Sequence, residues 1–296
     1  MGADRTTGAR VIALRDESAE RDVEIPVSTD ALQTLGWRRV VARTEGIEHL
    51  LSPLLAELRR DDCVHSWRQR LPKYGYIDSA SVVGLLEAEK VRRPTTTFAY
   101  VAIGLDGSEH VVAAGAISDR VRANFSYDAF PVLARCFIRS AYRGHGLYRA
   151  ILRHRYDNCF QVWGDRLAAI HLGSAEPAVW SVATGDPSFR APFVHIGDED
   201  LEVADALHPV RDFLAFAPGY VTRLLTQVRE AGEGPAAQEL HEHLERLTSH
   251  GLPEASLVQV RVLAEAASEE TGVELLDRDT PLHALTALGE AIPVVR

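Results

Sequence analysis

The residues best suited to chemistry gather in one short stretch, a glycine loop between an apolar run and a periodic segment. The run at 132–138 has the β-branched and aromatic residues of a buried strand, and the glycines Gly144 and Gly146 indicate a tight turn. From Leu147 onward, apolar residues recur at helical spacing. Glycines let a ligand approach the backbone, and the first amides of a helix have no partner within it. This order therefore predicts a phosphate-binding loop.

The loop lacks the features of the two common nucleotide motifs. A P-loop needs Lys followed by Ser or Thr, and a dinucleotide-binding loop needs a third glycine, whereas residues 143–148 read RGHGLY. The stretch instead resembles the pyrophosphate-binding motif of the GNAT acyltransferases, Arg/Gln-x-x-Gly-x-Gly/Ala. It matches at Arg143 and Gly146 and departs at Tyr148, where a small residue is usual. The same residues also fit an ordinary strand–helix turn.

A second segment resembles the same superfamily in spacing more than in chemistry. There, a strand follows the helix and leads into a pattern similar to Asn-x-x-Ala-x-x-x-Tyr-x-x-x-Gly-Phe. Residues 167–172 predict that strand, and the segment after it fits the frame at Gly185. However, Ser174 stands at the Asn position, Ser181 at the Tyr position and Asp186 at the Phe position.

The resemblance implies a fold, a reaction and a cofactor. The fold class is α/β (α+β), with a GNAT-like mixed, mostly antiparallel central sheet flanked by helices. The reaction is transfer of an acyl group from acyl-CoA, with acetyl-CoA the first expectation, to an amine of a small molecule in a ternary complex without a metal. The loop amides would hold the diphosphate, and the strand edge at 137–139 would pair with the pantetheine arm. The cofactor-binding residues implied are Phe137, Ile138, Arg139, Arg143, Gly144, His145, Gly146, Leu147, Tyr148 and Ser174.

Such a reaction also needs a base and an acid. The amine nucleophile loses a proton and the departing thiolate often gains one. The superfamily frequently uses a tyrosine as the acid, and Ser181, which stands in its place, has a hydroxyl that reaches less far. Glu176 and His171 are the expected candidate bases, with Asp128 as a further one. The catalytic residues predicted from the sequence are therefore Glu176, His171 and Ser181.

Two other functions remain open at this stage. Tyr148 in place of a small residue would crowd the diphosphate, which favours an acyl-carrier-protein-dependent N-acyl synthase. The lost tyrosine at position 181 favours instead a non-catalytic GNAT-like module that binds an acyl-CoA or a partner protein. The partners expected are a small-molecule amine acceptor, an acyl carrier protein under the second reading, and a second copy of the chain through the helical tail.

Composition sets limits on the class of protein. The 296 residues are 46% hydrophobic, enough for a full core, and the formal net charge of −10 argues against broad nucleic-acid binding. The three cysteines lack CxxC spacing, so neither a disulfide framework nor a zinc site is expected. The sequence has no apolar run of about eighteen residues and no apolar signal core near Met1. We therefore expect no membrane association and a cytoplasmic location.

The chain divides into three parts by pattern. Residues 1–36 are interpreted as an N-terminal leader or edge elaboration, 37–219 as a GNAT-like acyltransferase domain and 220–296 as a helical C-terminal domain. An Asp-Gly pair at 106–107 between alternating apolar runs predicts a hairpin. Within the middle part, strands are expected at 37–43, 96–104, 110–117 and 210–216, a helix at 48–60, and a contribution to the acceptor pocket from the aromatic residues of 61–93.

The helical tail carries one more resemblance. The segments at 256–263, 271–279 and 285–292 resemble the second half of an acyl carrier protein, with Ser256 at the position of the prosthetic-group serine. Ala255 stands where that family has an aspartate, and the unit is short. A plain helical extension or an oligomer interface is the favoured interpretation of this tail.

Overall fold

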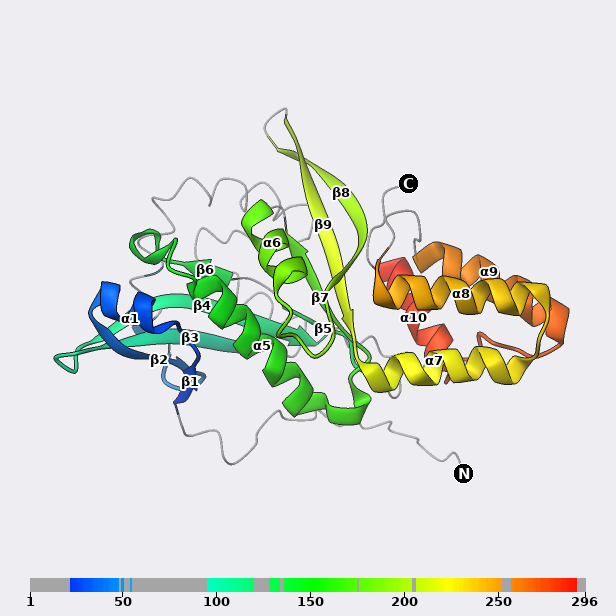
Figure 1. Ribbon diagram of the computed structural model, residues 1–296, viewed down its shortest axis with the longest axis horizontal. Coiled ribbons are helices and arrows are strands. Elements are labelled where there is room, and N and C mark those ends of the chain that lie inside the picture. Colours follow the sequence, from blue (N-terminus) through cyan, green and yellow to red (C-terminus); the bar gives the residue numbers. More distant parts are fainter. Residues whose placement is uncertain are drawn as a thin grey trace, which may run out of the picture.

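The computed structural model of the chain shows one twisted sheet, with two helices crossing one face and a group of helices beside one end (Figure 1). The predicted helix at 48–60, the segment 61–93 and Ser256 fall largely or wholly outside the residues that the structure describes. Those described residues are 22–47, 49–50, 54, 95–119, 128–133, 136–174, 176–203, 206–251 and 257–291.

The sheet is mixed and mostly antiparallel. Its strands follow the order β1-β2-β3-β4-β5-β7-β9-β8, with β6 paired to β4 beside β5. Among the described strands only β5 and β7 are parallel to each other. The strands are β1 Val23–Ile25, β2 Trp37–Arg43, β3 Thr95–Gly104, β4 Glu109–Asp119, β5 Pro131–Val132, β6 Cys136–Ile138, β7 Ala169–Ser174, β8 Val194–Val203 and β9 Ala206–Phe216.

Most of the described helices begin where the sequence signals a start. Proline stands in the first turn of α6, α7 and α8 and at the first position of α10, where its missing N–H costs no helical hydrogen bond. The short helix α1 has the Ser28 hydroxyl as its N-cap and Gly36 in the left-handed conformation at its end. The helices are α1 Thr29–Leu35, α5 Leu147–Trp163, α6 Pro177–Gly185, α7 Pro218–Ala231, α8 Pro235–Ser249, α9 Leu257–Thr271 and α10 Pro281–Ala291, with 3₁₀ turns at Ser140–Tyr142 and Gly164–Arg166.

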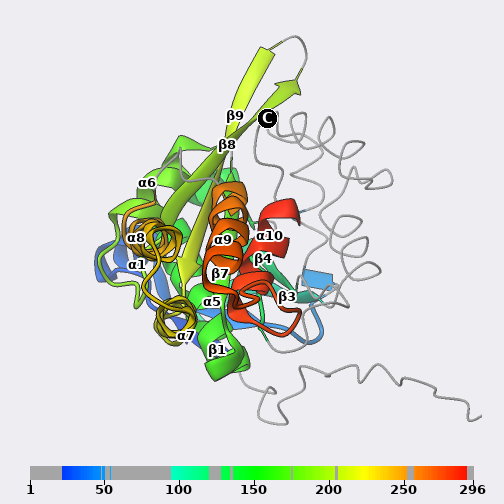
Figure 2. The same cartoon turned by 90° about the vertical axis from the view of Figure 1, so that its right-hand side faces the viewer.

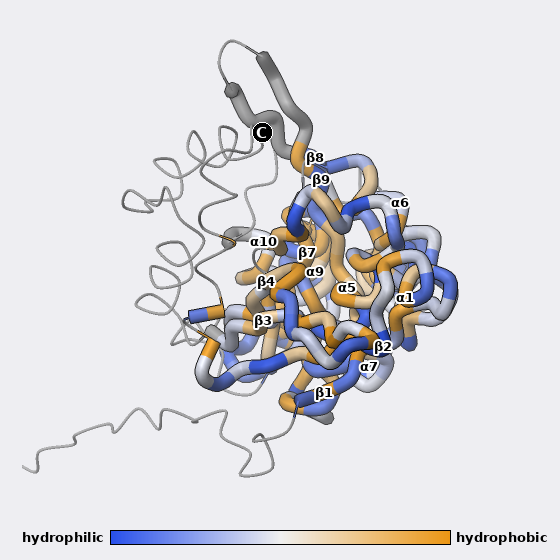
Figure 3. Tube along the Cα trace, turned by 90° about the vertical axis from the view of Figure 1, so that its left-hand side faces the viewer, coloured by the Kyte–Doolittle hydropathy of each residue, from blue (hydrophilic) through white to orange (hydrophobic). Residues whose placement is uncertain are grey.

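One large core joins the sheet to the helices. Helix α5 packs Leu147, Ile151, Leu152 and Tyr156 against the sheet, and each of these side chains is at most 1% exposed. Hydrophobic residues follow the central strands and α5 (Figure 3). The same core cluster continues through α7, α8, α9 and α10, which contact one another in the order α7, α8, α9, α10 and back to α7 (Figure 2). Full burial of such side chains stabilises the fold by roughly 1.5–3 kcal/mol each.

The predicted fold class is confirmed by this sheet and its flanking helices, and the hairpin at 106–107 joins β3 to β4 as expected. Residues 23–35, interpreted as leader or elaboration, form β1 and α1, and β1 extends the sheet beside β2. The sequence analysis missed β8 altogether and predicted only the second half of β9. Among the described residues, no helix combines the length and apolar character needed to span a bilayer.

Candidate functional site

The sheet opens where β5 gives way to β6. On β4, Ser118 pairs with Val132 and Gly115 pairs with Cys136, so the β5–β6 side has one residue more than β4 between these pairs. An extra residue of this kind is a β-bulge, which bends the strand. The Leu133 amide still donates to the carbonyl of β7 at His171, at 2.9 Å, but β6 pairs with β4 alone among the described strands. Beyond the bulge the sheet therefore has a fork.

The edge of β6 that faces the fork carries main-chain polar groups. The Arg139 amide donates to the Val112 carbonyl of β4 at 3.0 Å. Because hydrogen-bonding direction alternates along a strand, Phe137 also bonds toward β4, whereas the N–H and C=O groups of Cys136 and Ile138 point the other way. The Ile138 carbonyl accepts a bond from Arg143 Nε at 2.9 Å. The fork thus exposes a strand edge of the kind that an extended ligand can pair with.

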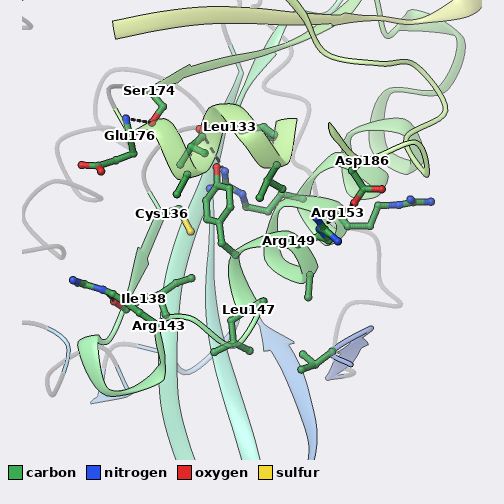
Figure 4. A pocket seen from close by; sticks show the side chains of 18 of the residues that line it. Leu133, Cys136, Ile138, Arg143, Leu147, Arg149, Arg153, Ser174, Glu176 and Asp186 are labelled. Carbon is green, nitrogen blue, oxygen red and sulfur yellow. Dashed lines mark hydrogen bonds and ion pairs between the residues drawn. The ribbon is translucent and has the colours of Figure 1, made fainter. Parts of the chain in front are cut away.

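A cavity of about 1150 Å³ lies over this fork and brings together elements that are far apart in the sequence. Cys136 and Ile138 line it from β6, and Ser174 and Glu176 from the end of β7 and the start of α6 (Figure 4). Its other described walls are the glycine loop, the first turns of α5 and the turn at 26–28 before α1. The cavity is large enough for a substantial part of a nucleotide thioester.

The glycine loop presents a run of unused main-chain donors to this cavity. Gly144 and Gly146 have φ of 82° and 74°, a left-handed conformation that glycine adopts without strain. The amides from Gly144 to Tyr148 have no hydrogen-bond partner among the described residues. They stand at the start of α5, which is 17 residues long, so the positive end of its dipole adds to their field. Donors in this arrangement form an anion site.

Basic and acidic side chains alternate around the first turns of α5. Arg149 lies 3.6 Å from Asp186, and Arg153 bonds Asp157 at 2.8 Å. Hydrogen bonds from Ser188 hold the pKa of the Asp186 carboxyl below its ordinary value, and the nearby Arg149 adds to that effect. In Figure 4, Arg149, Arg153 and Asp186 lie together on one side of the cavity and Ser174 and Glu176 on the other. The cavity therefore has two arginines, each beside an aspartate, on its α5 side and the Glu176 carboxylate across from them.

A buried arginine stands at the apex of the fork. Arg155 is 1% exposed, and its guanidinium donates to the Ala116 carbonyl at 3.3 Å and to the Leu133 carbonyl at 3.5 Å. These carbonyls lie beside the bulge, on β4 and just after β5. Burial raises the pKa of both the Tyr148 phenol and the Cys136 thiol, and the charge of Arg155 opposes the rise. Arg155 thus supplies fixed positive charge where the strands separate.

Nine of the residues predicted from the sequence line the cavity, and the rest do not. Arg139 donates Nη1 to the Val111 carbonyl at 3.2 Å and lies outside the lining, as does the half-buried His145. Ser181 lies on the exposed side of α6, away from the cavity. The structure brings together Phe137, Ile138, Arg143, Gly144, Gly146, Leu147, Tyr148, Ser174 and Glu176.

His171 and Asp128, the other candidate bases, are held in structural contacts away from the cavity lining. His171 is 4% exposed, and its Nε2 lies 2.6 Å from Oδ1 of Asp212 on the neighbouring strand β9. Asp128 is paired with Arg223 of α7, which ties the segment before β5 to the helical group. Burial raises the pKa of the Asp128 carboxyl, against the lowering effect of Arg223. Neither side chain is placed to meet an acceptor in the cavity.

The sequence analysis missed three contributors to the site. Cys136, to which the sequence analysis assigned no role in the site, lines the cavity from β6. Arg155 follows Tyr148 by two helical turns, a spacing that places both on one face of α5 and could have signalled the arginine. Ser28 and its neighbours belong to a segment set aside as an edge elaboration, and no motif marked them. Among the described residues, no group of three or more His, Cys, Asp or Glu side chains is arranged to hold a metal ion.

Comparison with known proteins gives a likeness in structure only. No protein-family model matches the chain, and no curated protein matches it. A spermidine N-acetyltransferase from Vibrio cholerae, solved with CoA and spermine, is similar with a TM-score of 0.43 and 14% identity, over 60% of this chain and 95% of that one.

Two further solved structures are similar at the same level. A ribosomal L7/L12 alpha-N-protein acetyltransferase in complex with coenzyme A has a TM-score of 0.38 and 15% identity, over 66% of this chain and 99% of that one. An acetyltransferase of the GNAT family from Streptococcus pneumoniae has a TM-score of 0.40 and 13% identity, over 60% and 99%. Values this low carry no argument about activity, so the function has to be argued from the geometry of the site.

Proposed function

We propose that the chain is an acyltransferase of the GNAT type, which moves an acyl group from an acyl-CoA, acetyl-CoA in the first instance, to an amine of a small molecule. One observation carries this proposal: Gly144, Gly146, Leu147 and Tyr148, whose amides have no partner among the described residues, line the same cavity as the exposed edge of β6. A diphosphate followed by a chain of amides is the kind of ligand that matches both features at once.

The loop amides would hold the diphosphate. Hydrogen bonds from main-chain N–H groups to a charged oxygen are worth roughly 1.5–3 kcal/mol each. Arg149 and Arg153 line the adjoining wall, each beside an aspartate, and their guanidinium groups have further N–H donors for the phosphates. Arg143, matched to the family motif, instead turns back to the Ile138 carbonyl. Its contribution would come through the loop's main chain and through the shape of the strand edge.

The β6 edge would hold the pantetheine arm. The Ile138 N–H, directed into the fork, is the donor that an amide carbonyl of the arm would meet, in the manner of an added strand. This pairing would set the thioester beside Cys136 and Tyr148, at the apex of the fork. Fixing donor and acceptor in place can supply roughly 7–11 kcal/mol of the reduction in barrier.

Glu176 is the proposed general base. It is the one member of the predicted catalytic set that lines the cavity, and its carboxylate projects from the start of α6 opposite the two arginines of α5 (Figure 4). A carboxylate there attracts an ammonium acceptor. The ammonium first loses one proton to solvent to give the amine, and Glu176 can take the second proton as the C–N bond forms. The acyl-CoA supplies the activated acyl group, and the chain's own groups orient it and move the protons.

Calorimetry with two donors tests the proposal. Acetyl-CoA and S-acetylpantetheine share the thioester, but only the first carries the diphosphate and nucleotide. We expect acetyl-CoA to bind at least 100-fold more tightly, since the loop amides have nothing to hold in the shorter donor. No heat of binding with acetyl-CoA at millimolar concentration would remove the proposal.

A carrier-protein donor is the second candidate. The observation that favours it is Tyr148, whose ring lines the cavity where the family motif has a small residue. Turnover with an acyl-loaded carrier protein and none with acetyl-CoA, across a panel of amines, would replace the first proposal by this one.

A further inference from the structure

The hydroxyl of Tyr148 stands at the apex of the fork with nothing in the described part of the chain to bond it. Tyr148 and Arg155 lie seven residues apart on α5, hence two turns apart on the face that looks at the sheet. The charged or titratable groups that act on the hydroxyl are Arg155, which bonds the Leu133 carbonyl, and Cys136 of β6. Tyr148, Arg155 and Cys136 all line the cavity.

The phenol of Tyr148 is half-buried and lines the cavity. The Tyr148 hydroxyl makes no hydrogen bond with any described residue, and burial raises its pKa, so it stays protonated at neutral pH. A hydroxyl that lines a cavity and has no protein partner can donate a hydrogen bond to a ligand bound there. On the proposed path of the pantetheine arm, the ligand atom that reaches the apex is the thioester sulfur.

We propose that the Tyr148 hydroxyl binds the thioester sulfur and gives its proton to the departing thiolate. This inference rests on the proposed function and names the acid that the function lacks. The amine nitrogen uses its electron pair to form the C–N bond, and Glu176 takes a proton from nitrogen. The C–S bond breaks, and sulfur leaves with the bonding pair and receives the hydroxyl proton. Tyr148 is then reprotonated from solvent, while the positive charge of Arg155 stabilises the transient phenolate.

This assignment places the acid on α5 and not on α6. The family pattern puts a tyrosine where this chain has Ser181, and that serine lies on the exposed side of α6, outside the cavity. Tyr148 occupies a motif position at which a small residue is usual. The two departures from the family pattern then have one explanation, because the phenol missing from α6 is supplied from the start of α5.

Titration of bound CoA tests the inference without knowledge of the acceptor. Thiolate absorbance is followed against pH in the CoA complex under reducing conditions, with the desulfo-CoA complex as the blank, for the wild type, Tyr148→Phe and Tyr142→Phe. Tyr142 lines the same cavity but packs edge-on against Trp37, with ring centroids 5.0 Å apart, and is the matched control. Because a hydroxyl donor stabilises the thiolate, Tyr148→Phe should raise the pKa of the bound thiol by about one unit. The control should leave it unchanged.

The outcomes distinguish a failure of this inference from a failure of the proposed function. Calorimetry should show that Tyr148→Phe still binds CoA, because the diphosphate contacts are intact, and a thermal melt checks that the variant is folded. If the wild type binds no CoA, the proposed function fails and the inference fails with it. If CoA binds and the thiol pKa in Tyr148→Phe equals that in the wild type, the inference alone is overturned. A second variant, Tyr148→Leu, gives the same reading should the phenylalanine variant be unstable.

Discussion

The starts of helices α5 and α8 differ in what satisfies their first amides. At α8, the Ala236 amide donates to the Glu270 carboxylate of α9 at 2.8 Å, and that side chain packs tightly against Gly234. At α5, the amides from Gly144 to Tyr148 meet no described group. Amides without a protein partner at a helix start bond water or a ligand, and we propose that those of α5 bind the diphosphate. On that proposal, the start of α8 serves folding and the start of α5 serves binding.

A large side chain at the start of α5 should have the largest effect on donor binding. In Gly146→Trp the indole projects from a glycine whose added Cβ meets no atom within 4 Å, into the space proposed for the diphosphate. We expect calorimetry to show acetyl-CoA affinity lowered at least 100-fold, or about 3 kcal/mol. Gly107→Trp is the control, because Gly107 has a similar φ of 84° and open surroundings in the β3–β4 turn. Equal affinity in the two variants would contradict the placement of the loop.

Neutralising Glu176, which lies across the cavity from the start of α5, should lower turnover and leave donor binding unchanged. Glu176→Gln removes the proposed base, and general base catalysis is worth roughly 10²–10⁴-fold in rate. With any amine that the wild type accepts, we expect kcat to fall by about 100-fold and the calorimetric affinity for acetyl-CoA to stay the same. Ser181→Ala on the same helix should leave kcat unchanged. A full rate in Glu176→Gln would assign the base elsewhere.

The middle of α5 should give the protein a pH-dependent stability that the open start does not. Burial and the neighbouring Arg155 lower the pKa of His154 to about 4, and its Nδ1 lies 3.2 Å from the Tyr100 hydroxyl. The unfolded chain takes a proton below about pH 6.5 while the folded one stays neutral. Neutral His154 therefore leaves the free energy of unfolding at its full value above pH 6.5. That free energy falls by up to about 3 kcal/mol as the pH drops toward 4.

Denaturant unfolding at a series of pH values measures this effect. His154→Gln removes the titrating ring, so its free energy of unfolding should fall less steeply between pH 6.5 and 4 than that of the wild type. Parallel curves for the two proteins would show that His154 carries no such effect.

Removing the Glu270 cap from the start of α8 should have the smallest effect, and that effect should be on stability. Glu270→Ala leaves the Ala236 amide without its acceptor, and loss of a helix cap costs about 1 kcal/mol. We expect denaturant unfolding to show that loss and acetyl-CoA affinity to be unchanged. Glu269→Ala is the control. Glu269 lies one residue earlier and is also exposed, so its removal takes away the same charge but no helix cap. If the two variants unfold alike, the contact at α8 has no stabilising role.

The sequence predicted the parts of the site that depend on local geometry. The segment around Gly144 and Gly146 predicts a strand, a turn and a helix. The structure has the turn and the helix, but the strand expected at 132–138 is divided into β5 and β6. The hairpin at 106–107 was predicted for the same reason, because an Asp-Gly turn is a local signal.

The features that the sequence did not reveal depend on pairing between distant segments. The bulge before Cys136 follows from the pairing of β6 with β4, which the sequence alone does not give. Likewise, only the contact with Asp212 shows that His171 is not available as a base in the cavity. β8 escaped prediction because its outer half, Asp198 to Glu202, is rich in acidic residues and lacks a clear apolar alternation. Arg155 is a charged residue in a helical stretch, and only its contacts show that it is buried.

In the proposed function, the amides of the glycine loop bind a diphosphate. Amide NMR of ¹⁵N-labelled protein titrated with CoA tests this directly, because each loop residue reports on its own N–H. We expect large downfield shifts for Gly144 and Gly146, saturating together, with Gly107 and Gly232 unmoved. Unshifted Gly144 and Gly146 signals in a protein saturated with CoA would contradict it.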